Sequence, residues 1–374
     1  MNTFFLVLLL FFNILSIAYT HDAHYLNQLA FDTTQLKVHD IITQQNIINE
    51  PKAHIKQFKG SDTLAYVTPW NNKGMDIAKK FKGKFNYISP VWFNVYHDGQ
   101  IKISGEHDVD IPWINDVKVE INGQVYGKIV PRFQFQGWQL EDYQGFINNL
   151  EEHEMLSNAI IDFTKKYDFD GIVLECGFPT AFLSFLQKIS HDLHEIDREI
   201  ILVLPPLRKE YSKMLDAQVY DFMAQFIDRF SIMTYDYSSS SIQGGPNSPT
   251  DWIIENINEL TNEKNRYQLL VGINLYAMSY SSTKQPEPLI MDQVIEKLTM
   301  PRDTLDDDDI TIYWDKESEE HWFNEVDEDG VQQETIWMPS VKSIQRRIHL
   351  AEDYQTGLSL WEIGQGLDYF YNEF

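Results

Sequence analysis

Acidic and aromatic side chains stand at the ends of several short apolar runs, where they could bind a sugar. Glu175 ends one such run, Asp236 follows another, and Trp361 ends the last. Aromatic rings stack against the C–H faces of pyranose rings, while carboxylates accept hydrogen bonds from sugar hydroxyls. The pattern therefore predicts a carbohydrate-binding site. The candidate binding residues are Trp70, Trp92, Glu175, Met233, Tyr235, Asp236, Tyr276 and Trp361.

The apolar runs have the length and composition of buried parallel strands. Eight of them alternate with helix-period segments, which predicts an α/β fold, namely a closed (β/α)8 TIM barrel. Functional residues of such barrels gather at the carboxyl ends of the strands, which is where the candidate residues fall. The expected strands are Leu64–Thr68, Phe85–Val91, Lys128–Phe133, Gly171–Glu175, Ile200–Leu204, Phe230–Thr234, Leu269–Asn274 and Gly357–Trp361. The expected helical segments include Leu140–Tyr167, Thr180–His194 and Tyr211–Phe226.

The stretch between the seventh and eighth expected strands is longer than one crossover helix requires. It contains two strand-like pieces, Ile310–Trp314 and Glu334–Met338, so we expect a small β-rich insertion at about residues 276–345. An acidic run, Asp306–Asp309, lacks the spacing of a calcium loop and is interpreted as a solvated turn.

The first 60 residues are expected to lie outside the barrel, which takes residues 61–374. An apolar run from Phe4 to Ile17, followed by small residues, predicts a secretory signal peptide over residues 1–20. The run is shorter than the roughly 20 residues that a membrane span needs, so we expect no membrane anchor after cleavage. Residues 21–60 are polar and are interpreted as an N-terminal extension.

The overall charge narrows the class of partner. Acidic residues outnumber basic ones by 56 to 30, which gives a formal net charge of −26. Such a field repels phosphate backbones, so nucleic-acid binding is not expected. The sequence carries no metal, phosphate or cofactor motif, so we expect no metal and no cofactor. Its single cysteine, Cys176, cannot form an internal disulfide.

The residues around the sixth and eighth expected strand ends resemble those of glycoside hydrolase family 18, the chitinase family. Met233–Tyr237 looks like the sixth-strand signature of that family, and Trp361 looks like the tryptophan that floors its central sugar subsite. The resemblance covers the chain from about residue 60 and sharpens to one chitinase-like branch. The stretches that carry it are Tyr66–Asn71, Ile88–Trp92, Met233–Ser238 and Trp361–Tyr371.

This resemblance implies a ligand and a destination. The expected ligands are oligosaccharides that contain N-acetylglucosamine. The branch is associated with secretion and lysosomal delivery, so we expect a secreted or lysosomal protein, with a sorting receptor as a further expected partner.

The fourth expected strand departs from the family at the position of the catalytic acid. Active members carry Asp-Gly-x-Asp-x-Asp-x-Glu, in which the Glu protonates the leaving oxygen and the Asp before it orients the substrate's acetamido group as internal nucleophile. Aligned through Asp170 and Gly171, the motif puts Val173 and Glu175 at the inner aspartates and Gly177 at the acid. Glu175 should lie roughly 6.6 Å deeper than the acid, too far for proton transfer. We therefore expect no catalytic residue and predict that the chain is not an enzyme.

Three functions remain open from the sequence. The preferred one is a catalytically inactive, lectin-like protein that binds chito-oligosaccharide or related glycans, with Glu175 hydrogen-bonded to Tyr235 or another barrel-lining group. The second is a secretory or lysosomal protein-interaction scaffold. The third is a weak glycosidase that uses Glu175 and Asp236. Cys176 should point outward toward the helices, in a packing role.

Overall fold

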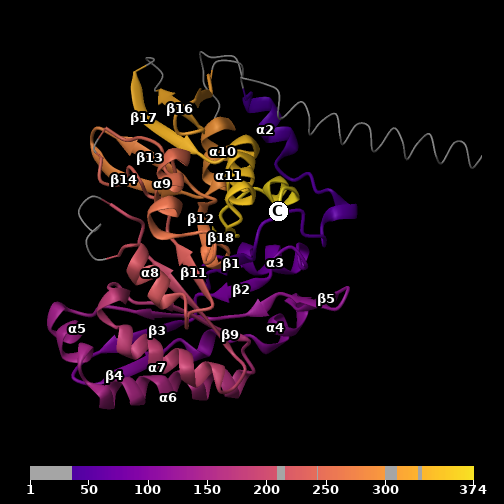
Figure 1. Ribbon diagram of the computed structural model, residues 1–374. Coiled ribbons are helices and arrows are strands. Elements are labelled where there is room, and N and C mark those ends of the chain that lie inside the picture. Colours follow the sequence, from indigo (N-terminus) through magenta and orange to yellow (C-terminus); the bar gives the residue numbers. More distant parts are fainter. Residues whose placement is uncertain (1–35, 209–214, 242, 300–309, 327–330) are drawn as a thin grey trace, which may run out of the picture.

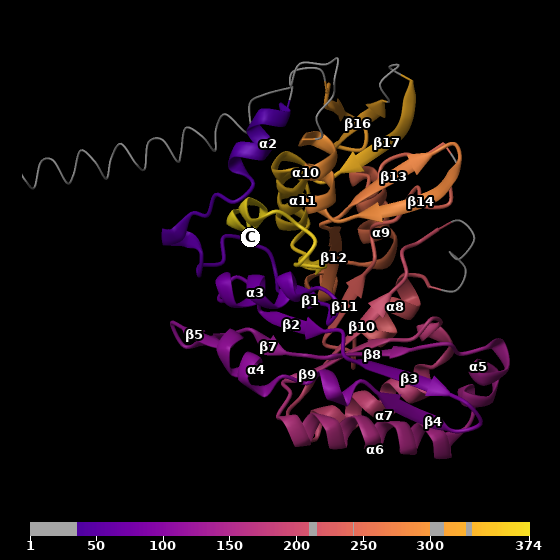
Figure 2. The ribbon, with the colours of Figure 1, turned by 180° about the vertical axis from the view of Figure 1, so that it is seen from behind.

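A parallel β-barrel forms the centre of the molecule, with an inserted lobe on one side and a layer of helices on the opposite side (Figures 1 and 2). The computed structural model describes residues 36–208, 215–241, 243–299, 310–326 and 331–374. The expected signal peptide and the acidic run 306–309 lie outside the described residues, so export stays a prediction. No helix in the described ranges is long and apolar enough to span a membrane.

Eight parallel strands close the barrel, and two of them are interrupted. β2 and β3 are the amino-terminal (lower) and carboxyl-terminal (upper) halves of the second strand. β7 and β8 are the corresponding halves of the third strand. The lower halves pair at Tyr87 and Lys128, while the upper halves pair at Phe93 and Phe133. The third strand breaks at Pro131, which has no backbone N–H to donate. The order is β1, β2/β3, β7/β8, β9, β10, β11, β12 and β18, and β18 pairs back with β1.

The predicted fold class is confirmed, and three strands have the predicted bounds. The barrel strands are β1 (Thr63–Val67), β2 (Tyr87–Pro90), β3 (Phe93–His97), β7 (Lys128–Ile129), β8 (Arg132–Phe135), β9 (Gly171–Glu175), β10 (Glu199–Leu204), β11 (Arg229–Ile232), β12 (Leu269–Asn274) and β18 (Gly357–Trp361). β4 (Ile101–Ser104) extends β3 as a hairpin, and β5 (Val119–Ile121) with β6 (Gln124–Tyr126) forms a separate one.

Side chains of each barrel strand alternate between two apolar layers. In β9, Val173 points into the barrel, while Ile172 and Leu174 belong to the larger core between barrel and helices. Because both faces are buried, the strands are continuous apolar runs, and this made them visible in the sequence.

In the part of the chain that the structure describes, one α-helix precedes the first strand, and the other α-helices lie between strands. They are α2 (Val38–Gln44), α3 (Asn72–Lys80), α4 (Ile111–Val117), α5 (Leu140–Ile147), α6 (Leu150–Tyr167), α7 (Leu183–His194), α8 (Ala217–Met223), α9 (Thr250–Leu260), α10 (Met291–Thr299) and α11 (Val341–Tyr354). The segment expected as one helix over 140–167 is two helices, because the side chain of Asn149 accepts the backbone N–H of Glu152 and starts α6 anew.

The inserted lobe is a five-stranded antiparallel sheet between β12 and β18. Its order is β14 (Lys284–Leu289), β13 (Ala277–Ser281), β17 (Gln332–Met338), β16 (Glu320–Val326) and β15 (Tyr313–Asp315). The β-rich insertion is thus confirmed, with five strands where the sequence showed two strand-like pieces. Lys297 of α10 forms ion pairs with Glu325 and Glu334, so α10 packs on one face of this sheet.

The described part of the N-terminal extension packs beside the end of the chain (Figure 1). The backbone N–H of Asn49 donates to the side chain of Asn372 at 2.8 Å, and the N–H of Gln57 donates to the carbonyl of Phe374 at 2.9 Å. These contacts tie residues near 50 to the short 3-10 helix Asp368–Asn372.

A buried histidine makes the stability of the lobe sensitive to pH. His321 in β16 is 1% exposed, lies 2.8 Å from the Ser340 hydroxyl and contacts the Trp314 ring at 4.7 Å between centroids. Burial, with a smaller contribution from Lys342, lowers the pKa of His321 to about 3. The folded state therefore keeps this ring neutral at pH values where the unfolded chain protonates it.

We predict that stability falls as the pH drops from about 6.5 toward 3, because only the unfolded state binds a proton at His321 in that window. At pH 4.5 this group lowers the free energy of unfolding by about 3 kcal/mol relative to neutral pH. Urea unfolding at pH 7.5 and 4.5 should show a smaller acid-induced loss in His321→Gln than in the wild type. His107→Gln, at an exposed histidine, is the control and should match the wild type. An equal loss in His321→Gln would contradict the prediction.

Candidate functional site

Trp361 stands at the carboxyl end of β18, where the barrel meets the lobe. Its half-buried ring packs on the interior cluster of the barrel, with the Tyr66 ring 5.2 Å away between centroids. It also packs against the lobe cluster of Tyr276, Met278 and Tyr280. Trp361 therefore forms a floor that both parts of the molecule support.

Glu175 ends β9 and is held by two partners from the neighbouring strand β8. Arg132 forms an ion pair with it at 2.8 Å, and the Gln134 amide donates to its other oxygen at 2.9 Å. The Arg132 guanidinium also lies 5.4 Å from the centre of the Trp361 ring. Glu175 is thus bound to barrel-lining groups, but its partners are Arg132 and Gln134, and not the Tyr235 that the sequence suggested.

Asp236 follows β11 in a left-handed backbone conformation, with φ at 61°. Its backbone N–H donates to the Asn247 side chain at 2.6 Å, and its carbonyl accepts from Arg208 at 2.8 Å. The Tyr276 hydroxyl donates to its carboxylate. Burial raises the pKa of Tyr276 well above its usual value and the Asp236 charge raises it further, so Tyr276 keeps its proton.

Tyr235 lies near both of these carboxylates. Burial raises the pKa of its hydroxyl, with further contributions from Tyr66, Glu175 and Asp236. A Cβ on Gly272 of β12 would come within 2.9 Å of the Tyr235 ring, so the glycine makes room for it. Met233 contacts the interior cluster from the same loop.

One of the predicted binding residues lies apart from this group. Trp92 is 3% exposed and packs in the outer core at 6.0 Å from Trp113 and 6.3 Å from Phe169. It therefore lies across the barrel wall from Trp361. Trp70, beyond the end of β1, is 71% exposed.

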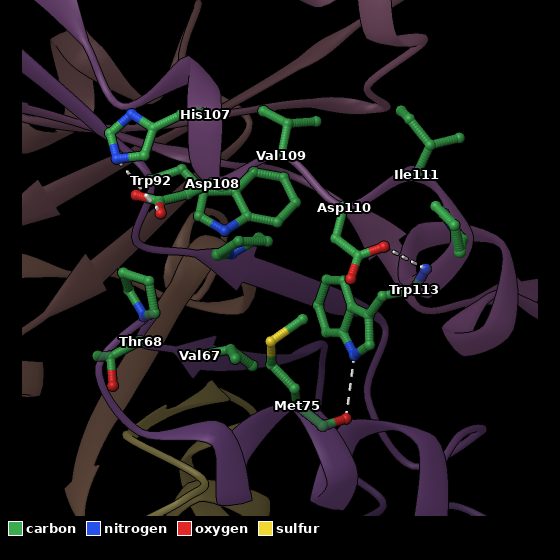
Figure 3. A pocket seen from close by; sticks show the side chains of 13 residues that line it. Val67, Thr68, Met75, Trp92, His107, Asp108, Val109, Asp110, Ile111 and Trp113 are labelled. Atoms are coloured by element: carbon green, nitrogen blue, oxygen red, sulfur yellow. Dashed lines mark hydrogen bonds and ion pairs between the residues drawn. The ribbon is translucent and has the colours of Figure 1, made fainter.

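Trp92 instead borders a separate pocket of about 520 Å³ between the tops of β1 and β2 and the helices α3 and α4 (Figure 3). The indole N–H of Trp113 in its wall donates to the Met75 carbonyl, and Asp110 accepts the backbone N–H of Trp113 (Figure 3).

Among the described residues, no three His, Cys, Asp or Glu side chains gather as a metal site requires.

The residues of the fourth-strand motif lie at the two ends of β9. Asp170, at the amino end, accepts the Ile129 backbone N–H at 2.7 Å and pairs with Lys118 at 2.8 Å. A Cβ on Gly171 would stand 2.2 Å from the backbone of β10, so this position needs glycine. At the carboxyl end, Cys176 is buried in the outer core and Gly177 is exposed.

The site thus contains residues that the sequence did not single out. Arg132 and Gln134 hold Glu175, and Asn247 holds the backbone of Asp236. The sequence could have indicated Arg132 as a site residue, because a charged residue inside a strand that is buried on both faces needs a partner of opposite charge.

Comparison with known proteins decides the family. The sequence model of glycosyl hydrolases family 18 matches residues 62–366, which is most of the chain. This chain belongs to glycoside hydrolase family 18. The resemblance noted at the sixth and eighth strands is therefore confirmed at the level of the family.

Individual relatives are distant. A cortical fragment-lytic enzyme of Bacillus subtilis is 21% identical over 250 residues, and the match covers 63% of this chain and 56% of that relative. A crystal structure of a chitinase from Chromobacterium violaceum superposes with a TM-score of 0.67 at 17% identity, covering 84% of this chain and 97% of the other. An Ostrinia furnacalis chitinase domain in complex with penta-N-acetylchitooctaose has a TM-score of 0.63 at 13% identity, with coverage of 82% and 90%.

The prediction that this chain is not an enzyme is contradicted by these comparisons. The family consists of glycosyl hydrolases, and the similar proteins are named as chitinases and lytic enzymes. The prediction rested on Gly177 at the position of the acid and on the expected depth of Glu175 below it. Glu175 still ends β9, and Tyr235 and Asp236 still follow β11, at the carboxyl end of the barrel.

The Arg132–Glu175 pair should hold the site together energetically. We predict that Arg132→Met lowers the free energy of unfolding by about 2–4 kcal/mol, because it leaves the Glu175 carboxylate without its cation in a largely buried position. Glu175→Gln leaves the still more buried Arg132 without its anion, so it should lose a similar amount.

Urea unfolding of both variants and of the double variant measures the coupling, and the double variant should lose less than the sum of the two. Lys79→Met is the control, because Lys79 pairs with Asp76 in solvent and its removal should cost no more than about 0.5 kcal/mol. Additive losses would show that the two side chains act independently.

Proposed function

We propose that the chain binds a glycan built from N-acetylglucosamine units over Trp361 and hydrolyses it with Glu175 and Asp236 as its carboxylates. The observation that carries this proposal is the linkage of both carboxylates to one aromatic floor. Glu175 is linked to Trp361 through Arg132, and Asp236 is linked to it through Tyr276.

The floor suits a pyranose ring. A half-buried indole offers an apolar face for the C–H groups of the sugar, and Glu175 and Asp236 beside it can accept hydrogen bonds from hydroxyl and acetamido N–H groups. Support for this ligand class comes from the family match and from the chitin oligomer bound by the Ostrinia chitinase.

The family chemistry gives Glu175 a role. It stands where active members carry the aspartate that orients the acetamido group, whose oxygen attacks the anomeric carbon as the bond to the leaving oxygen breaks. With glycine at residue 177, the leaving oxygen takes its proton from water, and a second water opens the cyclic intermediate, which makes the reaction slow. A carboxylate at this position stabilises the positive charge that develops on the sugar as the glycosidic bond breaks. Because Arg132 and Gln134 fix both of its oxygens, Glu175 needs little reorganisation to do so.

We also propose that the chain belongs to the family branch represented by chitinase domain-containing protein 1. Support comes from the terminal run Trp361–Tyr371, which contributes the fully buried rings of Phe370 and Tyr371 to the core. The scaffold role, the sorting receptor and lysosomal delivery stay predictions from the sequence.

Binding should depend on the indole of Trp361. We predict that Trp361→Ala weakens binding of an N-acetylglucosamine pentamer by about 2 kcal/mol, or roughly 30-fold, because the central stacking surface is lost. Isothermal calorimetry measures the dissociation constant. Tyr126→Ala, on the separate β5–β6 hairpin, is the control and should bind like the wild type. Unchanged affinity in Trp361→Ala would rule out this floor.

Hydrolysis should depend on the charge of Glu175. We predict slow cleavage of the pentamer by the wild type and a rate lower by about 10²–10³ in Glu175→Gln, which keeps the size of the side chain and loses its charge. Chromatography of the products measures the rate, and Glu120→Gln on β5 is the exposed control. The hydrolytic part fails if the wild type binds the pentamer and leaves it intact, or if Glu175→Gln is as fast as the wild type.

A further inference from the structure

The space above Gly177 contains a hydroxyl group from another element. A Cβ built on Gly177 would have one residue within 4 Å, namely Tyr143, with its hydroxyl oxygen at 3.1 Å and its ring carbon Cζ at 3.7 Å. A carboxylic acid that began at residue 177 would therefore have to pass this hydroxyl. The position that the family gives to an acid is next to a phenol here.

Aromatic packing fixes the ring of Tyr143. It stacks on Phe182 at 5.7 Å with an interplanar angle of 18°, and it meets the edge of Phe178 at 5.4 Å. Trp138 lies against it at 5.4 Å, and the Trp138 indole N–H donates to the Val95 carbonyl of β3. The hydroxyl is thus held in place by groups on several elements.

The helix that carries Tyr143 is also fixed. Asp142 accepts the backbone N–H of Gln139 at 2.8 Å, which caps the start of α5. The same carboxylate lies 2.8 Å from His97 at the end of β3. α5 is therefore attached to the upper half of the second barrel strand by its first turn.

The Tyr143 hydroxyl has a proton to offer. Burial raises its pKa and the nearby Cys176 raises it further. A hydrogen bond with the Gly177 backbone lowers the pKa, and smaller effects of Asp142 and Glu175 raise it, so the phenol is neutral at physiological pH. A backbone group that lowers the pKa of a phenol donates its N–H to the phenol oxygen, so the hydrogen bond with Gly177 uses this oxygen as acceptor and leaves the O–H as a donor. The donor is available to a ligand beside Glu175.

We propose that Tyr143 is a ligand-contacting residue of the site, whose hydroxyl donates a hydrogen bond to the glycosidic oxygen of a glycan bound over Trp361. It occupies the place from which the family's acid would reach that oxygen. This inference rests on the proposed glycan site, and it assigns to α5 a contact that the fourth-strand motif does not supply.

Three variants test the assignment with the N-acetylglucosamine pentamer as probe. Tyr143→Phe keeps the ring packing and removes only the hydroxyl, so it should unfold like the wild type and bind about tenfold more weakly. Gly177→Ala places a methyl group 3.1 Å from the hydroxyl and should displace it by a few tenths of an ångström, which also weakens binding. Once Phe replaces Tyr143, the same methyl group has 3.7 Å of clearance and should have no further effect.

The decisive result is therefore the non-additivity of Tyr143→Phe and Gly177→Ala in the binding free energy, measured by calorimetry. Tyr126→Phe is the matched loss of an exposed hydroxyl and should leave affinity unchanged. Wild-type affinity in Tyr143→Phe, or additive losses in the double variant, would overturn this inference while Trp361→Ala still reports on the glycan site. A wild-type chain that does not bind the pentamer would overturn the proposed function and this inference together.

Discussion

The ion pair between Arg132 and Glu175 is the interaction on which the arrangement of the site depends. It joins the third and fourth strands of the barrel where the third strand resumes after Pro131. An arginine with 8% side-chain exposure inside a barrel with an apolar interior must have its charge balanced, and Glu175 is the carboxylate that it contacts. The same guanidinium supports Trp361, so one cation positions both an acidic group and the aromatic floor.

A second buried pair connects the lobe to the other carboxylate. Glu320, at the start of β16, pairs with Arg347 of α11 at 2.9 Å, and both side chains are almost fully buried. Glu320 also accepts the backbone N–H of Asn247, and Asn247 in turn accepts the backbone N–H of Asp236. The lobe therefore supports the loop that carries Asp236, which explains how an insertion between distant strands can bear on the centre of the barrel.

The sequence specified the barrel better than the site. Strands such as Gly171–Glu175 and Gly357–Trp361 are buried on both faces, so their apolar runs have the same ends as the strands themselves. The sequence analysis did not predict the break at Pro131 or the strand β3. Trp92 and Phe93 are both apolar, so the sequence does not show that the strand is interrupted between β2 and β3. Their rings pack in the outer core, and the direction of a side chain just after a strand break depends on the tertiary packing.

The partners of the site residues come from other strands and loops, so the spacing of residues along the chain does not predict them. Glu175 was found through its motif, but its contact with Arg132 arises from the register between β8 and β9. Tyr143 comes close to Gly177 only because α5 folds back over the end of β9. The same limit applies to the prediction about activity, which examined the positions of one motif without the groups that the fold brings beside them.

Cys176 gives this arrangement a built-in reporter. The thiol lies between Glu175 and Gly177 in sequence and is buried in the outer core, where burial raises its pKa. A thiol reacts as the thiolate and only where a reagent can reach it, so a thiol reagent should modify Cys176 slowly in the folded chain. Since the chain has one cysteine, the labelling rate measures how often the end of β9 separates from its helices, and local opening of the site can be timed without any introduced probe.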